Sequence, residues 1–202
     1  MSLTKAERPR PMAGESLGFC PAPELLAWVE RVILSEGGAL YNPDHAHLVD
    51  ADLAFLWAPN AFEKAGRVVL GQAEQVMFRA GGWQKARQEQ QMVEWFGRVP
   101  AFLITLAADY CADCSDADFC ALVEHELYHI GQRRDEFGAP AFDKEGRPKL
   151  RIVGHDAEEF VGVVARYGPS SDVRRLVAAA GAAPAVPRLD IAWACGCCLK
   201  AA

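Results

Sequence analysis

The run His125-Glu126-Leu127-Tyr128-His129 combines residue types at a spacing that could do metal chemistry. Histidines four residues apart lie one turn from each other on one face of a helix, so both imidazoles can reach one metal ion at about 2.0–2.1 Å. Glu126 lies between them and could take a proton from a water that the metal activates. The H-E-x-x-H pattern therefore predicts a zinc site of the hydrolase type, with Glu126 as the catalytic base.

The residues around the motif indicate a helix. Ser115-Asp116 is typical of a helix N-cap, and a step of about 100° per residue places Glu126 within the apolar stripe that follows, with His125 and His129 along its flank. Because a buried carboxylate without a partner is costly, a solvated helix with two surface histidines would leave Glu126 unexplained. The stripe consists of apolar residues at spacings of three and four: Phe119, Leu122, Val123, Leu127 and Ile130.

A catalytic zinc site usually has three protein ligands, so a third must come from elsewhere in the chain. The other histidines are His155 and the pair His45 and His47. We expect His155 to begin a second helix at residues 154–160, where it lies one turn from Glu159 on the same flank. His155 is the favoured third ligand and Glu159 the alternative, since imidazole and carboxylate both bind zinc.

Four other polar residues near these segments have less specific roles. Asp156 could orient a histidine ligand or simply be a first-turn acid that the helix dipole favours, and the sequence leaves both open. His45 and His47 follow the turn signal Asn42-Pro43-Asp44, so we expect them in a loop rather than at the metal. Tyr128 lies on the opposite side of the helix from Glu126, which favours packing or solvent exposure over an oxyanion contact.

Several segments between residues 50 and 167 complete a wider pattern. With them the chain resembles the phage-type metallopeptidases, small zincin-like domains found in phage and prophage genomes. The resemblance implies a metal-dependent peptidase with His125 and His129 as ligands, Glu126 as base, and His155 or a neighbour completing the site. The matching segments are Phe55-Leu56-Trp57, Val69-Leu70-Gly71-Gln72-Ala73-Glu74, Phe102-Leu103-Ile104-Thr105-Leu106, the H-E-L-Y-H motif, and Gly154-His155-Asp156-Ala157-Glu158-Glu159-Phe160.

Length and composition agree with one soluble domain. The chain has 202 residues, of which 51% are hydrophobic, enough to bury a core without disulfides. Its first nineteen residues contain no apolar signal region and no later stretch is long and apolar enough to span a bilayer, so the sequence predicts a cytoplasmic protein, in the host cytoplasm if phage-encoded. A formal charge of −6 argues against broad affinity for nucleic acid or anionic membranes, which leaves a peptide or protein substrate as the expected partner.

The predicted fold is α+β: a single zincin-like domain at residues 23–180, with a small mixed sheet packed on helices and the motif on a central helix. Residues 1–22 are expected to form a loose, polar lead-in, and residues 181–202 an Ala/Pro-rich and Cys-rich tail. The family resemblance suggests that the apolar strand just before the motif helix lines the cleft and pairs with an extended substrate. Helices are expected at 24–35 and 83–99, and strands at 51–58, 66–76 and 101–107.

Between the two segments that carry the histidines, Asp143-Lys144-Glu145-Gly146 predicts a turn, and its flanks predict a hairpin beside the cleft. The hairpin region is rich in basic residues. These could favour acidic substrates or a partner, although charged loops are usually just solvated. The basic residues are Arg133, Arg134, Arg147, Lys149 and Arg151.

The cysteines depart from the family pattern. Cys111 and Cys114 have C-x-x-C spacing, Cys120 lies nearby, and the tail carries Cys195-Gly196-Cys197-Cys198. Four thiolates from the two groups could bind a second, structural zinc. Reduced thiols or a redox disulfide are the alternatives.

The sequence therefore predicts a zinc-dependent metallopeptidase that hydrolyses peptide bonds with a metal-activated water and a glutamate base. The same ligands and base would also serve a metal hydrolase that acts on a non-peptide bond. A non-catalytic zinc-binding adaptor or regulatory module is the third possibility.

Overall fold

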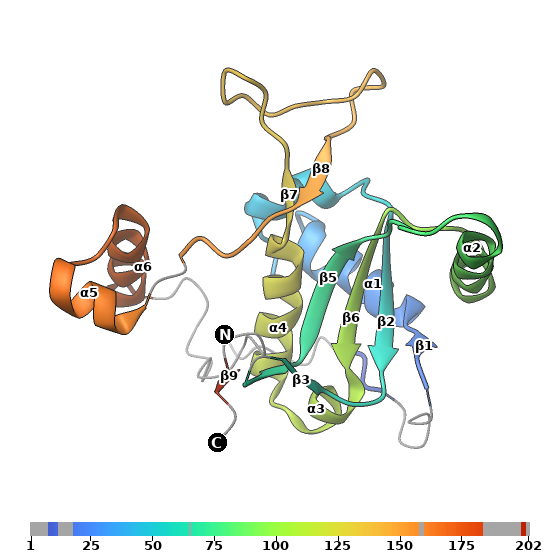
Figure 1. Ribbon diagram of the computed structural model, residues 1–202, viewed down its shortest axis with the longest axis horizontal. Helices are drawn as coiled ribbons and strands as arrows, with labels where there is room; N and C mark the ends of the chain where they lie inside the picture. The colour runs from blue at the N-terminus through green and yellow to red at the C-terminus, as the bar shows by residue number, and fades with distance from the viewer. Residues whose placement is uncertain (1–7, 12–17, 65, 158–159, 184–198, 201–202) are drawn as a thin grey trace.

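A computed structural model describes residues 8–11, 18–64, 66–157, 160–183 and 199–200. It contains a mixed four-stranded sheet packed with helices, which confirms the predicted single α+β domain (Figure 1). The sheet order is β1-β2-β6-β5, with β2 and β6 parallel and the two outer pairs antiparallel. Its strands are β1 (Cys20–Pro21), β2 (Leu53–Ala58), β6 (Phe102–Ala107) and β5 (Gly71–Gln75).

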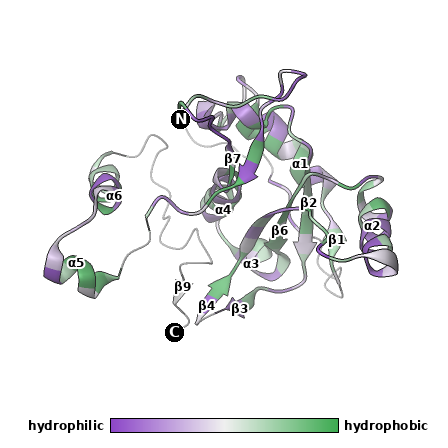
Figure 2. Ribbon diagram, turned by 45° about the horizontal axis from the view of Figure 1, so that its top comes forward, coloured by the Kyte–Doolittle hydropathy of each residue, from purple (hydrophilic) through white to green (hydrophobic). Residues whose placement is uncertain are grey.

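The two central strands are apolar on both faces because helices cover both sides of the sheet. Alternate residues of β2 and β6 belong to the main core, whose helical side is formed by α1 (Pro23–Val29), its π-helical continuation η1 (Glu30–Leu34) and α4 (Asp116–Tyr128). In Figure 2 both strands are coloured as hydrophobic. The strands predicted at 51–58 and 101–107 and the helix predicted at 24–35 are confirmed.

Helix α2 (Gly82–Phe96) covers the opposite face of the sheet near β2 (Figure 1). It confirms the helix predicted at 83–99, but none of its residues is fully buried. Met92, Trp95 and Phe96 are half-buried, and Trp95 and Phe96 pack over a small second cluster. The buried members of that cluster are Ala54, Leu56 and Leu103.

The prediction of a single strand at 66–76 is wrong: the segment forms two strands, because the chain changes from one partner strand to another at Leu70. Residues before it form β4 (Arg67–Val69), which pairs with β3 (Phe62–Lys64) and with β9 (Leu199–Lys200) in a second small sheet. Residues after it form β5 in the main sheet. The buried Leu70 side chain belongs to the main core, so it fixes the point where one strand ends and the next begins.

A long hairpin follows α4. Strands β7 (Ile130–Gln132) and β8 (Leu150–Ile152) form its stalk, and the chain between them makes two turns. The predicted turn is confirmed by a bond from Gly146 N–H to Asp143 O of 3.2 Å, and the other has a bond from Gly138 N–H to Asp135 O of 3.1 Å. Gly146 has φ 79°, a left-handed conformation that glycine adopts without strain. The stalk projects from the end of α4 in Figure 1, so the two segments that carry histidines meet at its base.

Three further α-helices follow the sheet strands described above. Helix α3 (Ala108–Asp113) connects β6 to α4, while α5 (Val161–Tyr167) and α6 (Ser171–Gly181) follow the hairpin. The helix predicted from residue 154 is wrong, because residues 153–157 form no helix and α5 begins only at Val161. No helix among the described residues is long and apolar enough to cross a bilayer.

Two parts of the predicted lead-in contact the main body of the protein. Strand β1 pairs with β2, and the side chain of Arg8 is almost fully buried. The Arg8 guanidinium donates to the carbonyl oxygens of Cys111 and Cys114 at 2.8 and 2.6 Å and to Asp116 at 2.6 Å. Arg8 therefore joins the beginning of the chain to the connection between α3 and α4.

Candidate metal centre

Helix α4 forms where the sequence predicts it. The Ser115 side chain caps its N-terminus by accepting the N–H of Asp118 at 3.1 Å, and the acids in its first turn suit the positive end of the helix dipole. The whole predicted apolar stripe, from Phe119 to Ile130, is buried. His129 is the C-cap residue, so the motif occupies the last turn, where the helix meets the hairpin.

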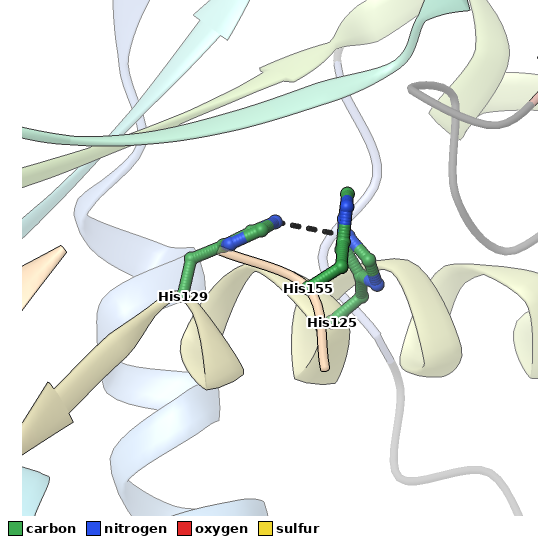
Figure 3. A group of neighbouring side chains, drawn as sticks. All are labelled: His125, His129 and His155. Atoms are coloured by element: carbon green, nitrogen blue, oxygen red, sulfur yellow. Dashed lines mark hydrogen bonds between the residues drawn. The ribbon is translucent and has the colours of Figure 1, made fainter. Parts of the chain in front are cut away.

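The structure brings His125, His129 and His155 together (Figure 3). The Nε2 atom of His125 lies 3.1 Å from Nε2 of His129 and 3.2 Å from Nε2 of His155. His155 reaches this point from the loop after β8 and not from a helix. The residue expected beside the motif histidines is therefore present, but the helix predicted around it is not. Glu159, the alternative ligand, lies outside the described residues.

The spacing of the three imidazoles fits one metal ion. Two ligand nitrogens on a tetrahedral zinc are about 3.3 Å apart, because each bond is about 2.0–2.1 Å long. The two shortest nitrogen separations here are within about 0.2 Å of that value. Within the described part of the chain, this is the group of three or more side chains that could hold a metal ion. Three protein ligands would leave a fourth position for water or substrate.

A backbone carbonyl orients one of the candidate ligands. Nδ1 of His129 lies 2.8 Å from the carbonyl oxygen of Val153, which accepts its proton and leaves the Nε2 lone pair for a metal. Val153 N–H in turn donates to His129 O at 2.8 Å. Sequence patterns did not reveal this contact, because the relevant atom belongs to the main chain. Asp156 is exposed and has no side-chain hydrogen bond or ion pair to the described residues, so neither of its two predicted roles is found.

Burial keeps His125 neutral. Burial, and then the neighbouring imidazoles of His129 and His155, lower the pKa of His125 from 6.5 to about 4. Metal binding requires the neutral imidazole, and a group with this pKa has it throughout the physiological pH range.

Glu126 is buried as the apolar stripe predicted, with 3% of its surface exposed. Burial raises the pKa of Glu126 from 4.5 to about 7, although a hydrogen bond from the backbone of Ala73 acts in the opposite direction. Its Oε2 has no hydrogen-bond partner among the described residues. A buried carboxyl oxygen without a partner fits a site that receives a water or a substrate group.

Strand β5 forms the wall against which Glu126 lies. A Cβ atom at Gly71 would be 2.5 Å from Glu126 Oε1, so only glycine leaves room for the carboxylate at this position. The bonds from Ala107 N–H to Leu70 O and from Val76 N–H to Ala101 O show which β5 residues face β6. Along a strand the N–H and C=O groups of successive residues point to opposite sides, so those of Gly71, Ala73 and Gln75 point away from β6, to the outer edge of the sheet. The Ala73 N–H that bonds Glu126 belongs to this set.

The strand expected to pair with a substrate is not at a sheet edge. β6 lies between β2 and β5 and pairs with both along its length, so the expectation for residues 101–107 is wrong. β5 is the terminal strand and lies against α4. Sequence could not distinguish them, because strand order is a tertiary property.

His45 and His47 lie outside the histidine cluster, as expected, but in the 3-10 helix η2 (Pro43–Leu48) and not in a loop. Nε2 of His47 lies 2.7 Å from the carbonyl oxygen of Ile130, which holds the chain just beyond α4. His45 is fully buried, with its ring 4.4 Å from that of Tyr128. The Tyr128 hydroxyl donates to Asp44 at 3.0 Å, so its predicted place away from Glu126 is confirmed.

The C-x-x-C pair lies in and just after α3, near the N-terminal end of α4, whereas the histidine cluster lies at the C-terminal end of α4. Cys111 is buried and Cys114 half-buried, and both are free thiols. A hydrogen bond between the two thiols raises the pKa of Cys111 and lowers that of Cys114. Cys195, Cys197 and Cys198 lie outside the described residues, so the second zinc stays a prediction.

A family model described as "Putative phage metallopeptidase" matches residues 26–181. The chain belongs to this family. The match includes all three histidines of the cluster and Glu126, and it confirms the resemblance that the sequence segments indicated. No curated protein and no solved structure matches the chain. Family membership and the three-histidine cluster together indicate a metallopeptidase with a metal centre at the base of the hairpin.

The raised pKa of Glu126 predicts that the metal-free protein loses stability as pH rises. Below about pH 4.5 the carboxyl group is protonated in the folded and unfolded chains alike, whereas up to about pH 7 only the unfolded chain ionises. The rise from 4.5 to about 7 corresponds to about 3 kcal/mol of unfolding free energy lost across this range. Urea unfolding with a chelator present should show this loss for the wild type relative to Glu126→Gln, which stays neutral. A difference between the two proteins that does not change with pH would contradict the burial of Glu126.

Proposed function

We propose that the protein is a zinc-dependent peptidase in which His125, His129 and His155 bind the metal and Glu126 is the general base. The convergence of three imidazole Nε2 atoms at 3.1 and 3.2 Å separations is the observation that carries the proposal. Zinc bound there would polarise a carbonyl group and acidify a water molecule. The donor set favours zinc, since three neutral imidazoles with an open position are typical of catalytic zinc sites.

Glu126 has the properties of a general base at neutral pH. In the metal-free protein burial places its pKa at about 7, so the carboxyl group can accept and release a proton near neutral pH. Strand β5 restricts where the carboxylate can go, because Gly71 allows its close approach and Ala73 N–H holds one side of it. Burial among apolar side chains excludes bulk water from the protein side of the carboxylate, which strengthens its interaction with a substrate proton.

The free edge of β5 is the proposed binding strand for the peptide. The backbone groups of Gly71 and Gln75 and the Ala73 carbonyl point outward there, beside the Ala73 N–H that bonds Glu126, and an extended peptide can pair with such an edge by main-chain hydrogen bonds. Because Glu126 contacts the same edge, a peptide paired with β5 would lie beside the base. This arrangement favours a peptide bond over other hydrolysable bonds, since only an extended polyamide can complete the strand pairing.

The proposed ligands predict about one equivalent of zinc at this site. His125→Ala/His129→Ala should lose it, and His155→Ala should weaken affinity far more than Glu159→Gln, because loss of a ligand removes a direct bond. Metal content by elemental analysis and affinity by chelator competition would measure this. Cys111→Ala/Cys114→Ala is the control for a second ion bound by thiolates. Unchanged zinc content in the double histidine variant would refute the site.

The role of Glu126 predicts a separation of turnover from metal binding. Glu126→Gln should retain metal and fold but lose about 10²–10⁴-fold in kcat, the usual contribution of a general base. Cleavage of a peptide library, analysed by mass spectrometry, would measure it. Activity within a few-fold of the wild type would show that another group moves the proton, and no cleavage by either protein would favour a binding module.

The fit between Gly71 and Glu126 predicts a loss of activity from a single added methyl group. Gly71→Ala should displace the carboxylate and lower kcat by at least about tenfold while zinc content is unchanged, because misplacing a reacting group by about 1 Å is costly. Gly81→Ala is the matched control, since it lies in extended backbone with no atom within 4 Å of the added Cβ. Equal turnover by the two variants would contradict the proposed position of the base.

A further inference from the structure

The hairpin that ends at the metal centre carries a row of cations on one face. Gly131 pairs with Arg151, and the bond from Arg133 N–H to Lys149 O of 2.7 Å extends the same register. Paired residues and residues two apart share a face of a hairpin, so Arg133, Lys149 and Arg151 point the same way. We call these three side chains the cationic face.

The cationic face lies away from the core. The alternate positions of the same strands include Ile130, which is fully buried, and Leu150, which packs against the main core. Arg133, Lys149 and Arg151 are exposed. In Figure 2 the upper part of the hairpin is coloured as hydrophilic. A partner in solution can therefore reach all three charges.

No acid neutralises the cationic face within the described part of the protein: its three side chains form no hydrogen bond or ion pair there. Three of the four acids of the hairpin, Asp135, Asp143 and Glu145, form contacts within its turns. Asp143 pairs with Arg147 at 2.8 Å, and Asp135 accepts the N–H groups of Phe137 and Ala139 at 2.9 Å.

The arrangement has an energetic cost in the free protein. Arg133 N–H bonds Lys149 O just beyond the last paired residues of β7 and β8, so the two residues are neighbours across the stalk, and like charges on neighbouring strands destabilise their pairing. The chain as a whole is acidic, with a formal charge of −6, so the positive surface is local. An anionic partner on this face would remove the repulsion. The charge pattern thus favours a ligand with several negative groups spaced along an extended chain.

The cationic face begins at the metal centre. Ile130 directly follows His129, and Val153, whose carbonyl oxygen holds His129, is two residues from Arg151 and two from His155. Arg133 is four residues beyond His129, which corresponds to about 13 Å along a strand. An extended peptide bound at the metal centre could therefore place residues within about five positions of the cleaved bond against these cations.

We propose that the cationic face binds an acidic segment of the substrate, so that the enzyme selects peptides with acidic residues within about five positions of the cleaved bond. The inference rests on the proposed peptidase function. Three cations on an acidic protein are few for nucleic acid, where tight binding commonly uses about 6–10 phosphate contacts. A peptide carboxylate needs fewer, since each exposed pair adds a small increment to binding and selectivity.

The test compares two fluorescent peptide pools that differ only in carrying Glu or Gln at four fixed positions around a random centre. Arg133→Gln/Lys149→Gln/Arg151→Gln removes the cationic face, and Arg31→Gln/Arg79→Gln/Arg87→Gln removes the same charge from exposed positions elsewhere. Each triple variant is prepared with and without Glu126→Gln. Binding is measured by anisotropy on the Glu126→Gln proteins, and kcat/KM on the others.

The wild type should bind and cleave the Glu pool better than the Gln pool. Loss of the cationic face should reduce that ratio about tenfold at low salt, and about 0.5 M salt should abolish the difference, because exposed charges are screened. The control triple variant should keep the ratio. Equal ratios in the two triple variants, or no preference for Glu in the wild type, would overturn the inference.

Two outcomes separate this inference from the proposed function. Cleavage of both pools without a Glu preference would leave the peptidase intact and refute the acidic segment. Preferential binding of the Glu pool without cleavage would support the cationic face and refute the peptidase. A single-stranded oligonucleotide of equal charge is the third probe; tighter binding of it than of the Glu pool, lost in the Arg133/Lys149/Arg151 variant, would overturn a peptide partner in favour of nucleic acid.

Discussion

The burial of the Glu126 carboxyl group against the edge of the sheet constrains the rest of the site. An isolated carboxylate in an apolar interior is costly, and here burial raises its pKa to about 7. α4 can occupy this position only because β5 offers a glycine beneath the side chain and a backbone N–H beside it. The strand that accommodates Glu126 is also the terminal strand of the sheet, so one contact determines where the proposed base and a bound peptide would meet.

The hairpin determines the position of His155. The chain leaves α4 at Tyr128, and the two strands of the hairpin bring it back so that His155 lies beside the end of that helix. β7 begins directly after His129, and the two strands hold a common register until Val153 reaches His129 again through two hydrogen bonds. This pairing sets the third imidazole without a second helix. The same register places the basic residues on the outer face of the stalk, so the position of His155 and the charge pattern both follow from one strand alignment.

The end of α4 is also held from its other side. His47 contacts the carbonyl of Ile130, and Asn42 donates to both Glu124 and the Tyr128 hydroxyl. These contacts involve residues far from the motif in sequence, and they restrict the turn that carries both motif histidines. A metal site built on a helix end needs such support, because terminal turns lack some of the hydrogen bonds that hold the interior of a helix.

The sequence by itself determined the parts of this protein that depend on local periodicity. The cap at Ser115, the stripe that buries Glu126, the central strands and the turn at Gly146 all follow from patterns of a few residues, and so do the motif histidines and the family. His155 was also found by its residue type. The local structure around it was misjudged: apolar residues at Val153, Ala157, Phe160 and Val164 suggested a helix that includes His155, whereas His155 lies in a loop after β8 and α5 begins only at Val161.

Only the tertiary structure decided which strand is the free edge, which atom orients His129 and which residues share a face of the hairpin. β6 and β5 both read as strands, and their order in the sheet depends on how helices pack on the two faces. The Val153 carbonyl is a main-chain group that every residue possesses, so no side-chain pattern identifies it. The cationic face depends on strand register, which is set by pairing between residues far apart in the chain and leaves no local signal.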